Sequence, residues 1–205
     1  MTALEVLRHL KDLETPLIET RDVAQMLKIS VSLAGKHLES LSQQKFLKKI
    51  TRGRWLILGK EFDTLQIAEF LVAPQESYIS LHTALFYHGL IEQIPSRIYA
   101  VTLDRTRIVE TPMGIISFHH AQPDFFFGYE YLKPYLKLAT PEKALVDYFY
   151  YSPARSRQFT KLPEVEISKN FSWKKLREHC ERIPSARTRA LVKDKIRRQF
   201  PESKL

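Results

Sequence analysis

A basic turn between two short apolar runs is the feature that most restricts how this chain can fold. Residues 46–50 and 55–58 each have the length and apolar content of a short strand, and they are separated by Thr51-Arg52-Gly53-Arg54. A glycine in so short a connection is typical of a β-hairpin turn. We therefore predict a hairpin over residues 46–58 with two arginines at its tip.

Three stretches with the apolar spacing of helices precede the hairpin. The first has leucine every three residues from Leu4 to Leu13, and it ends before Pro16 because proline disfavours helical geometry in the residue before it. The second is expected to begin at the N-cap Thr20, and its apolar face is formed by Val23, Ala24 and Leu27.

The third predicted helix begins after Ser30, runs to about Gln44 and has two different faces. At 100° per residue, one side is apolar and is formed by Val31, Ala34, Leu38 and Leu41. The opposite side is small, polar and basic and is formed by Ser32, Lys36, Ser40 and Gln43. Such groups can reach base edges or phosphates in a DNA major groove. The alternative is an ordinary solvated face. Gly35 is expected to permit close approach of the second helix.

Three helices followed by a basic-tipped hairpin is the element order of a winged helix-turn-helix domain. Arginines at the tip can contact phosphates or enter a minor groove, whereas the alternative is a simple surface turn. Together with the third helix, the hairpin predicts a duplex DNA site. The predicted site consists of Arg21, Ser30, Ser32, Lys36, His37, Ser40, Gln43, Lys48, Thr51, Arg52, Gly53 and Arg54.

The charge distribution favours a polyanionic partner. The whole chain has a formal net charge of +9. Residues 28–60 contain eight basic residues and one acidic residue (8 − 1 = +7), and residues 172–205 contain eleven and four (11 − 4 = +7). Residues 61–171 contain ten and thirteen (10 − 13 = −3). Clustering of this kind is typical of nucleic-acid-binding proteins, although any single lysine is more often solvated surface.

Proline usage predicts two domains. Pro16 is the only proline before position 74, and ten follow from Pro74 onward. We place the boundary at residues 72–76, which gives a DNA-binding domain over 1–73 and a second domain over 74–205. The fold class is therefore α+β, with an N-terminal winged helix-turn-helix and a C-terminal domain in which helices pack on a small sheet.

In the second domain, strands are expected at 98–103, 107–110 and 115–119. Helices are expected to start near Ser80 and at Thr140-Pro141, and two more cover 172–182 and 185–200. Residues 118–151 are rich in aromatics, for which a hydrophobic core is the favoured interpretation and base stacking or a partner interface are the alternatives.

The last predicted helix carries a basic stripe spaced four residues apart, formed by Arg189, Lys193 and Arg197. Like charges at this spacing repel one another by about 0.2–0.5 kcal/mol per pair. A phosphate backbone or an acidic partner would relieve that repulsion. The stripe is therefore a candidate second polyanion surface, and solvated surface is the equal alternative.

Several classes of protein are excluded or disfavoured. No apolar run has the roughly 18 residues of a membrane span, and Glu5 and Asp12 interrupt any secretory signal, so a cytoplasmic protein is expected. The single Cys180 excludes a disulfide framework. No G-x-G-x-x-G, P-loop or metal-ligand motif occurs, so we expect neither an enzyme nor a metal or other cofactor.

Three stretches of the chain resemble the AbiEi-like antitoxins of bacterial type IV toxin–antitoxin (abortive infection) systems. Residues 46–55, FLKKITRGRW, are similar to the family's wing, in which many members have tyrosine where this chain has Trp55. Residues 78–91, YISLHTALFYHGLI, are similar to the stretch that opens the family's C-terminal domain. Residues 138–147, LATPEKALVD, look like the family's Ala-Thr-Pro-Glu-Lys-Ala-Leu-x-Asp.

The resemblance implies a transcriptional autorepressor that binds an inverted repeat in its own promoter. We also expect two protomers on the DNA, because a single winged helix reads only a few base pairs. The resemblance further implies that the C-terminal domain counteracts a nucleotidyltransferase toxin, which such an antitoxin need not bind directly. On this resemblance the candidate antitoxicity surface is the stripe of Arg189, Lys193 and Arg197. The alternative is a stand-alone winged-helix regulator whose C-terminal domain binds a ligand or partner. A third possibility is a nuclease or nucleotidyltransferase with a DNA-binding module.

Overall fold

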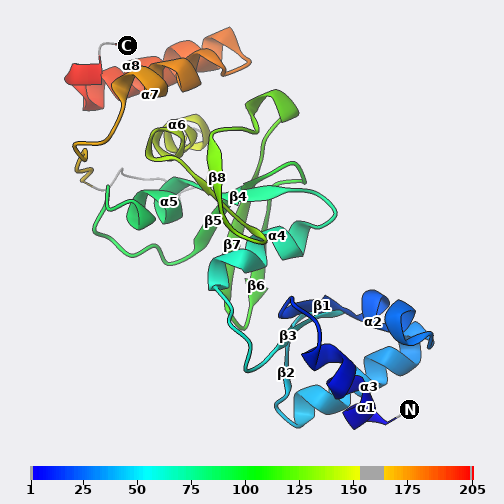
Figure 1. Cartoon of the computed structure of the whole chain (residues 1–205). Coiled ribbons are helices and arrows are strands. Elements are labelled where there is room, and N and C mark those ends of the chain that lie inside the picture. Colours follow the sequence, from blue (N-terminus) through cyan, green and yellow to red (C-terminus); the bar gives the residue numbers. More distant parts are fainter. Residues whose placement is uncertain (1, 153–163, 204) are drawn as a thin grey trace. The chain divides into compact units, whose positions relative to one another are not determined.

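The computed structural model describes residues 2–152, 164–203 and 205. Within these residues the chain is α+β, with eight α-helices and two β-sheets (Figure 1). It divides into two compact units, Met1–Thr64 with Thr111–Met113 and Leu65–Glu110 with Gly114–Leu205. The division falls before residues 72–76, because helix α4 (Ile67–Val72) is buried and contacts strands of the second unit.

The first unit contains three helices and a three-stranded sheet. Its elements are α1 (Ala3–Lys11), β1 (Leu17–Glu19), α2 (Thr20–Leu27), α3 (Val31–Gln43), β2 (Leu47–Thr51) and β3 (Arg54–Ile57). The three helices and the hairpin are present as predicted. Strand β1 was not predicted, because three residues are too few to give a pattern. β3 pairs antiparallel with both neighbours, so the strand order is β1-β3-β2.

One apolar core joins these helices to the sheet. Ala34, Leu38 and Leu41 of α3 are fully buried in it, together with Leu10 of α1 and Trp55 of β3. Burial of each leucine stabilises the fold by about 1.5–3 kcal/mol.

Two residues assigned to apolar faces lie outside this core. Leu4 is 63% exposed and Val31 is 53% exposed. Both belong to the first turn of a helix.

The second unit contains a six-stranded mixed sheet of order β6-β7-β5-β4-β9-β8. Its strands are β4 (Ser77–Ile79), β5 (Ile98–Thr102), β6 (Arg107–Thr111), β7 (Gly114–His120), β8 (Tyr129–Lys133) and β9 (Leu136–Ala139). β4 pairs parallel with β9 and antiparallel with β5, and β5 pairs parallel with β7. The predicted strands correspond to β5, β6 and β7, whereas β4, β8 and β9 were not predicted because they are short and lie among aromatic residues.

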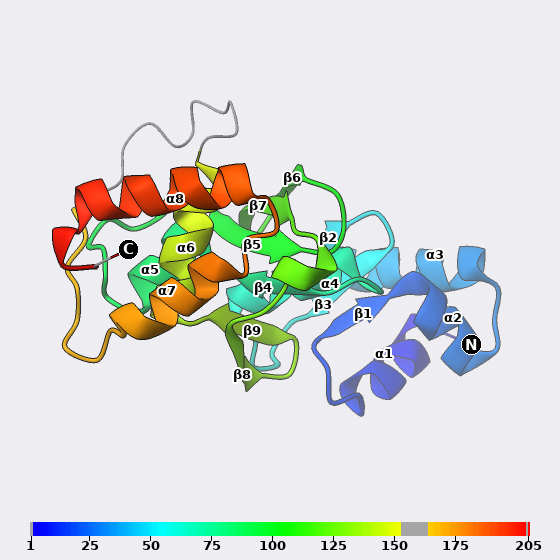
Figure 2. The same ribbon diagram turned by 90° about the horizontal axis from the view of Figure 1, so that it is seen from above.

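The remaining helices are α5 (Leu81–Tyr87), α6 (Pro141–Tyr151), α7 (Trp173–Glu181) and α8 (Ala186–Gln199). α6 contacts α5, α7 and α8, and Figure 2 shows these four helices together at the end of the second unit where the C-terminus lies. The segment 118–151 contributes to the core of the second unit, which agrees with the interpretation favoured from the sequence. Five of its eleven aromatic residues are buried, namely Phe118, Phe125, Tyr148, Phe149 and Tyr151, whereas Tyr131 and Tyr135 are exposed.

Candidate nucleic-acid interface

The tip of the β2–β3 hairpin is fixed to the start of α2 by Thr20. The backbone N–H of Thr20 donates to the carbonyl oxygen of Gly53 at 2.8 Å, and its hydroxyl donates to the same oxygen at 3.2 Å. The indole Nε1 of buried Trp55 donates to that hydroxyl at 2.9 Å. Thr20 is therefore not the N-cap that the sequence predicts. Glu19 occupies the N-cap, and the Thr20 side chain anchors the turn instead.

Gly53 allows the turn to adopt this shape. Its φ is +76°, in the left-handed region where residues with a Cβ are strained. The carbonyl oxygen of Gly53 accepts the hydrogen bonds from Thr20, and Arg52 and Arg54 precede and follow Gly53 in the chain. The glycine of the Arg-Gly-Arg tip thus has a conformational role, whereas the arginines supply the charge.

A groove of about 770 Å³ lies between the start of α2, the first turns of α3 and the hairpin tip. Five residues of the predicted DNA site line it, and these are Arg21, Ser32, Arg52, Gly53 and Arg54. Arg21 and Arg52 are exposed. Arg54 is held more firmly, since its Nε donates to Oε1 of Glu19 at 2.8 Å and its side chain is only 23% exposed. Three guanidinium groups and one carboxylate therefore share the groove.

The groove also includes residues that sequence reasoning did not assign to the site, namely Glu19, Thr20, Val31 and Gly35. A Cβ built on Gly35 would meet Thr20 Cγ2 at 3.8 Å, which is ordinary van der Waals contact. The close approach of α2 therefore does not require glycine at this position. No local sequence signal distinguishes Val31 from the core residues of α3, because it fits the apolar periodicity of that helix.

The outer face of α3 continues from this groove. Ser32, Lys36 and Gln43 are exposed, whereas Ser40 is half-buried and its hydroxyl accepts from Gln44 Nε2 at 3.2 Å. Glu39 borders this face and pairs with Lys49 of β2 at 2.7 Å, so its charge is offset by a lysine that also lies over the Trp55 ring.

Four other residues of the predicted DNA site, Ser30, His37, Lys48 and Thr51, are not part of the groove lining. The Ser30 hydroxyl caps α3 by accepting from Leu33 N at 3.2 Å. Lys48 and Thr51 are half-buried. His37 is half-buried with an enclosed Nε2, because its position on α3 is displaced from the polar face toward the core.

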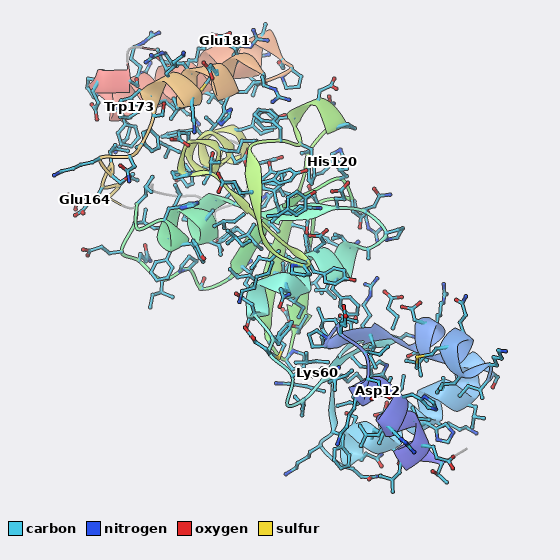
Figure 3. The ribbon with its side chains drawn as sticks, viewed as in Figure 1. Asp12, Lys60, His120, Glu164, Trp173 and Glu181 are labelled. Atoms are coloured by element: carbon cyan, nitrogen blue, oxygen red, sulfur yellow. The ribbon has the colours of Figure 1, made fainter. Side chains whose placement is uncertain are left out.

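The basic stripe of α8 differs from the solvent-facing row that the helical spacing predicts. Arg189 donates twice to the carbonyl of Ile183, and both Arg189 and Lys193 pair with Glu181 at the end of α7, which Figure 3 labels. Arg197 is exposed and donates to the Leu205 carbonyl at 2.5 Å. Intramolecular acceptors therefore offset much of the expected repulsion. On the same helix Ala190 is exposed, whereas Val192 is buried.

The second and third stretches of resemblance meet in one buried network. Lys143 and Asp147 of α6 are fully buried and form an ion pair one turn apart. Tyr78 OH and Ser80 Oγ donate to Asp147 Oδ2 at 3.0 and 2.7 Å. Lys143 Nζ also lies 3.7 Å from the centre of the Phe125 ring. Burial raises the pKa of Asp147 and lowers the pKa of Lys143.

The start of the same motif has structural roles as well. Thr140 caps α6 through its hydroxyl, and Pro141 occupies the first helical position, as the sequence predicts. Glu142 is buried, and its Oε1 accepts from Ser172 N at 2.8 Å, which ties α6 to the start of α7. These motif residues act in the interior of the second unit rather than at an exposed site.

In the described part of the chain, no three or more His, Cys, Asp or Glu side chains are arranged to hold a metal ion. No helix in the same residues is both long and apolar enough to cross a bilayer. A scan against models of known protein families gives no match, and a search of curated protein sequences gives none either.

Proposed function

We propose that the first unit is a winged helix-turn-helix domain that binds duplex DNA. In this proposal α3 enters the major groove and the β2–β3 turn contacts the sugar–phosphate backbone. The observation that carries it is the groove between α2, α3 and the hairpin tip, in which Arg21, Arg52 and Arg54 converge beside Ser32. Guanidinium groups are the side chains best suited to phosphate oxygens because they donate two parallel hydrogen bonds.

The shape of α3 supports DNA over a small anion as the partner. Its thirteen residues extend for about 20 Å. An α-helix with its side chains is about 10–12 Å in diameter, which fits the B-DNA major groove of about 12 Å width. Lys36 and Gln43 are exposed beyond the groove on the same face as Ser32. A small phosphate compound would occupy the groove and leave these two side chains without a role.

We further propose that the chain is a transcriptional repressor of its own promoter and the antitoxin of a type IV system. This assignment rests on the resemblance of residues 46–55, 78–91 and 138–147 to AbiEi-like antitoxins. It gains support from the way two of these stretches share the Lys143–Asp147 network, because residues matched far apart in sequence serve one structural purpose. The functional partner is then a nucleotidyltransferase toxin.

The DNA-binding proposal is tested by footprinting the full chain on the DNA upstream of its own gene. Protection of two symmetric half-sites is expected, with two protomers per duplex in sedimentation measurements, because one winged helix reads only a few base pairs. Protection of one half-site with a one-to-one complex at saturation would refute the paired arrangement. No protection at any site would refute the repressor.

The antitoxin proposal is tested by growth rescue beside a promoter–reporter assay in the same cells. A nucleotidyltransferase encoded next to the chain's gene is co-expressed with either of two variants. Arg189, Lys193 and Arg197 are changed together to Gln, since Glu at these positions would repel Glu181. This variant is expected to lose rescue and keep repression, whereas Arg52→Ala with Arg54→Ala is expected to do the reverse. Full rescue by the Gln variant would make the stripe ordinary surface, and equal loss of both activities would make it part of the DNA site.

A further inference from the structure

Val31 is an exposed apolar residue in the lining of a basic groove. It is the first residue of α3 and is 53% exposed, whereas Ala34, Leu38 and Leu41 of the same helix are fully buried. A single exposed apolar side chain on a protein surface is ordinary. The surroundings of Val31 therefore decide whether this one has a role.

Val31 has polar and charged neighbours on one side and a residue without a side chain on the other. Val31 lines the groove together with Ser32, the three arginines Arg21, Arg52 and Arg54, and Gly35. Gly35 follows Val31 by one helical turn on the same edge of α3, and it places no side chain beside the valine methyl groups. The valine thus offers an apolar contact that its neighbour one turn along does not cover.

The chemistry of DNA base edges identifies a partner for such a contact. In the major groove, thymine alone among the four bases presents a methyl group, and the other groups that distinguish the bases are hydrogen-bond donors or acceptors. A valine can contact that methyl but cannot satisfy a donor or acceptor. The first residues of a recognition helix are also those that contact base edges.

We infer that Val31 reads the 5-methyl group of a thymine in each half-site while the arginines of the groove hold the adjacent phosphates. This inference rests on the proposed DNA-binding function and adds a base preference to it. Ser32, the next residue along α3, can hydrogen-bond to any base or to a phosphate, so its hydroxyl does not specify a base by itself.

The test uses deoxyuridine in place of thymine, which removes the 5-methyl group and leaves base pairing intact. A duplex bound by the full chain is first selected from a random duplex pool, and each of its thymines is then replaced in turn. With unaltered protein, one position in each half-site is expected to lower the affinity about fourfold, which corresponds to burial of one methyl-sized group. The altered DNA perturbs the contact without altering the protein.

The same duplexes are then measured with Val31→Ala and with the control Leu33→Ala. Leu33 is 40% exposed on the same turn of α3 but is not part of the groove lining. Val31→Ala is expected to bind the thymine duplex about fourfold more weakly and to lose little more with deoxyuridine at the sensitive position, whereas Leu33→Ala keeps the full effect. Helical circular dichroism checks that both variants fold.

Three results would overturn the inference while leaving the DNA-binding proposal intact. In the first, replacing any thymine by deoxyuridine leaves the affinity of the unaltered protein unchanged. In the second, the replacement lowers the affinity equally for Val31→Ala and the unaltered protein. In the third, Leu33→Ala loses the deoxyuridine effect and Val31→Ala keeps it. Failure of the proposed function is recognised separately, because the pool would then yield no enriched duplex and no retarded complex.

Discussion

The backbone N–H and the hydroxyl of Thr20 both donate to the carbonyl oxygen of Gly53, 33 residues later in the chain. This pair of hydrogen bonds holds the hairpin tip against the first turn of α2. The Thr20 hydroxyl in turn accepts from the Trp55 indole, so one side chain joins the tip to the core. The position of the arginines on either side of Gly53 depends on this contact.

Thr20→Val is therefore expected to destabilise the first unit and to weaken DNA binding. The substitution keeps the shape of the side chain but leaves the buried Trp55 N–H without its acceptor, at a cost of about 1–3 kcal/mol. Chemical unfolding followed by Trp55 fluorescence measures the loss, in a Trp173→Phe background that leaves Trp55 as the one tryptophan of the chain. Thr20→Ser keeps the hydroxyl and serves as the control, and equal stability of the Val and Ser variants would show that the hydroxyl does not anchor the tip.

Glu19→Gln is expected to increase affinity for duplex DNA of any sequence. Glu19 is the acidic residue of the groove lining and pairs with Arg54, so its removal takes a carboxylate away from the phosphates. The gain is about 1 kcal/mol, the interaction of two unit charges about 4 Å apart in water. Gel-shift titration of random duplexes measures it, with Glu14→Gln, an exposed residue outside the groove, matched for charge. Equal affinities of the two variants would place the DNA elsewhere.

The helices of the first unit were predictable because their apolar periodicity is regular, and the hairpin because its basic glycine turn is distinct. The groove was less accessible to sequence reasoning. Thr20 has the residue type of an N-cap, and nothing local indicates that its hydroxyl bonds to a residue 33 positions away. Val31 fits the periodic core pattern, and only the packing of the whole unit places it outside.

The same limit applies to the second unit. The Thr140-Pro141 start of α6 was readable from the sequence because capping is a local interaction. The role of Lys143 was not, since a lysine in a helix is ordinarily exposed. Its burial follows from the approach of Phe125, Tyr78 and Gly128, which come from distant parts of the chain.

Lys143→Met is expected to destabilise the second unit by about 3–5 kcal/mol, because it leaves the buried Asp147 carboxylate without its cation. Adding Asp147→Asn should restore part of the loss, since an amide can still accept from Tyr78 and Ser80. Thermal unfolding of the single and double variants measures the coupling. Lys174→Met, at an exposed position of α7, is the control. A loss no larger than that of Lys174→Met would contradict the buried pair.

Acid should destabilise the second unit below about pH 6.5 because three of its histidines are buried or half-buried. Burial lowers the pKa of His82, His119 and His179 to about 4, and the nearby His82 lowers that of His119 further. Between the unfolded value of about 6.5 and the folded value, the unfolded state binds more protons, so stability falls as the pH falls through this window.

Urea unfolding at several pH values across that window measures the effect. His82→Phe places a ring that does not ionise between Tyr99 and Tyr148. This variant should therefore show a weaker pH dependence of the free energy of unfolding. His9→Gln, at an exposed position of α1, should leave it unchanged. An equal slope in the His82 variant and the unaltered protein would assign the acid sensitivity to other groups.

The central claim, that the hairpin tip and α3 bind duplex DNA, is tested most directly by the salt dependence of binding to the chain's own upstream DNA. For Arg52→Ala with Arg54→Ala, we predict weaker binding and a slope of log K against log salt that is smaller by about 1.8, or about 0.9 per lost phosphate contact. Arg8→Ala with Lys11→Ala removes the same charge from exposed positions of α1 and should change the slope little. Unchanged affinity and slope in the Arg52/Arg54 variant would contradict the account.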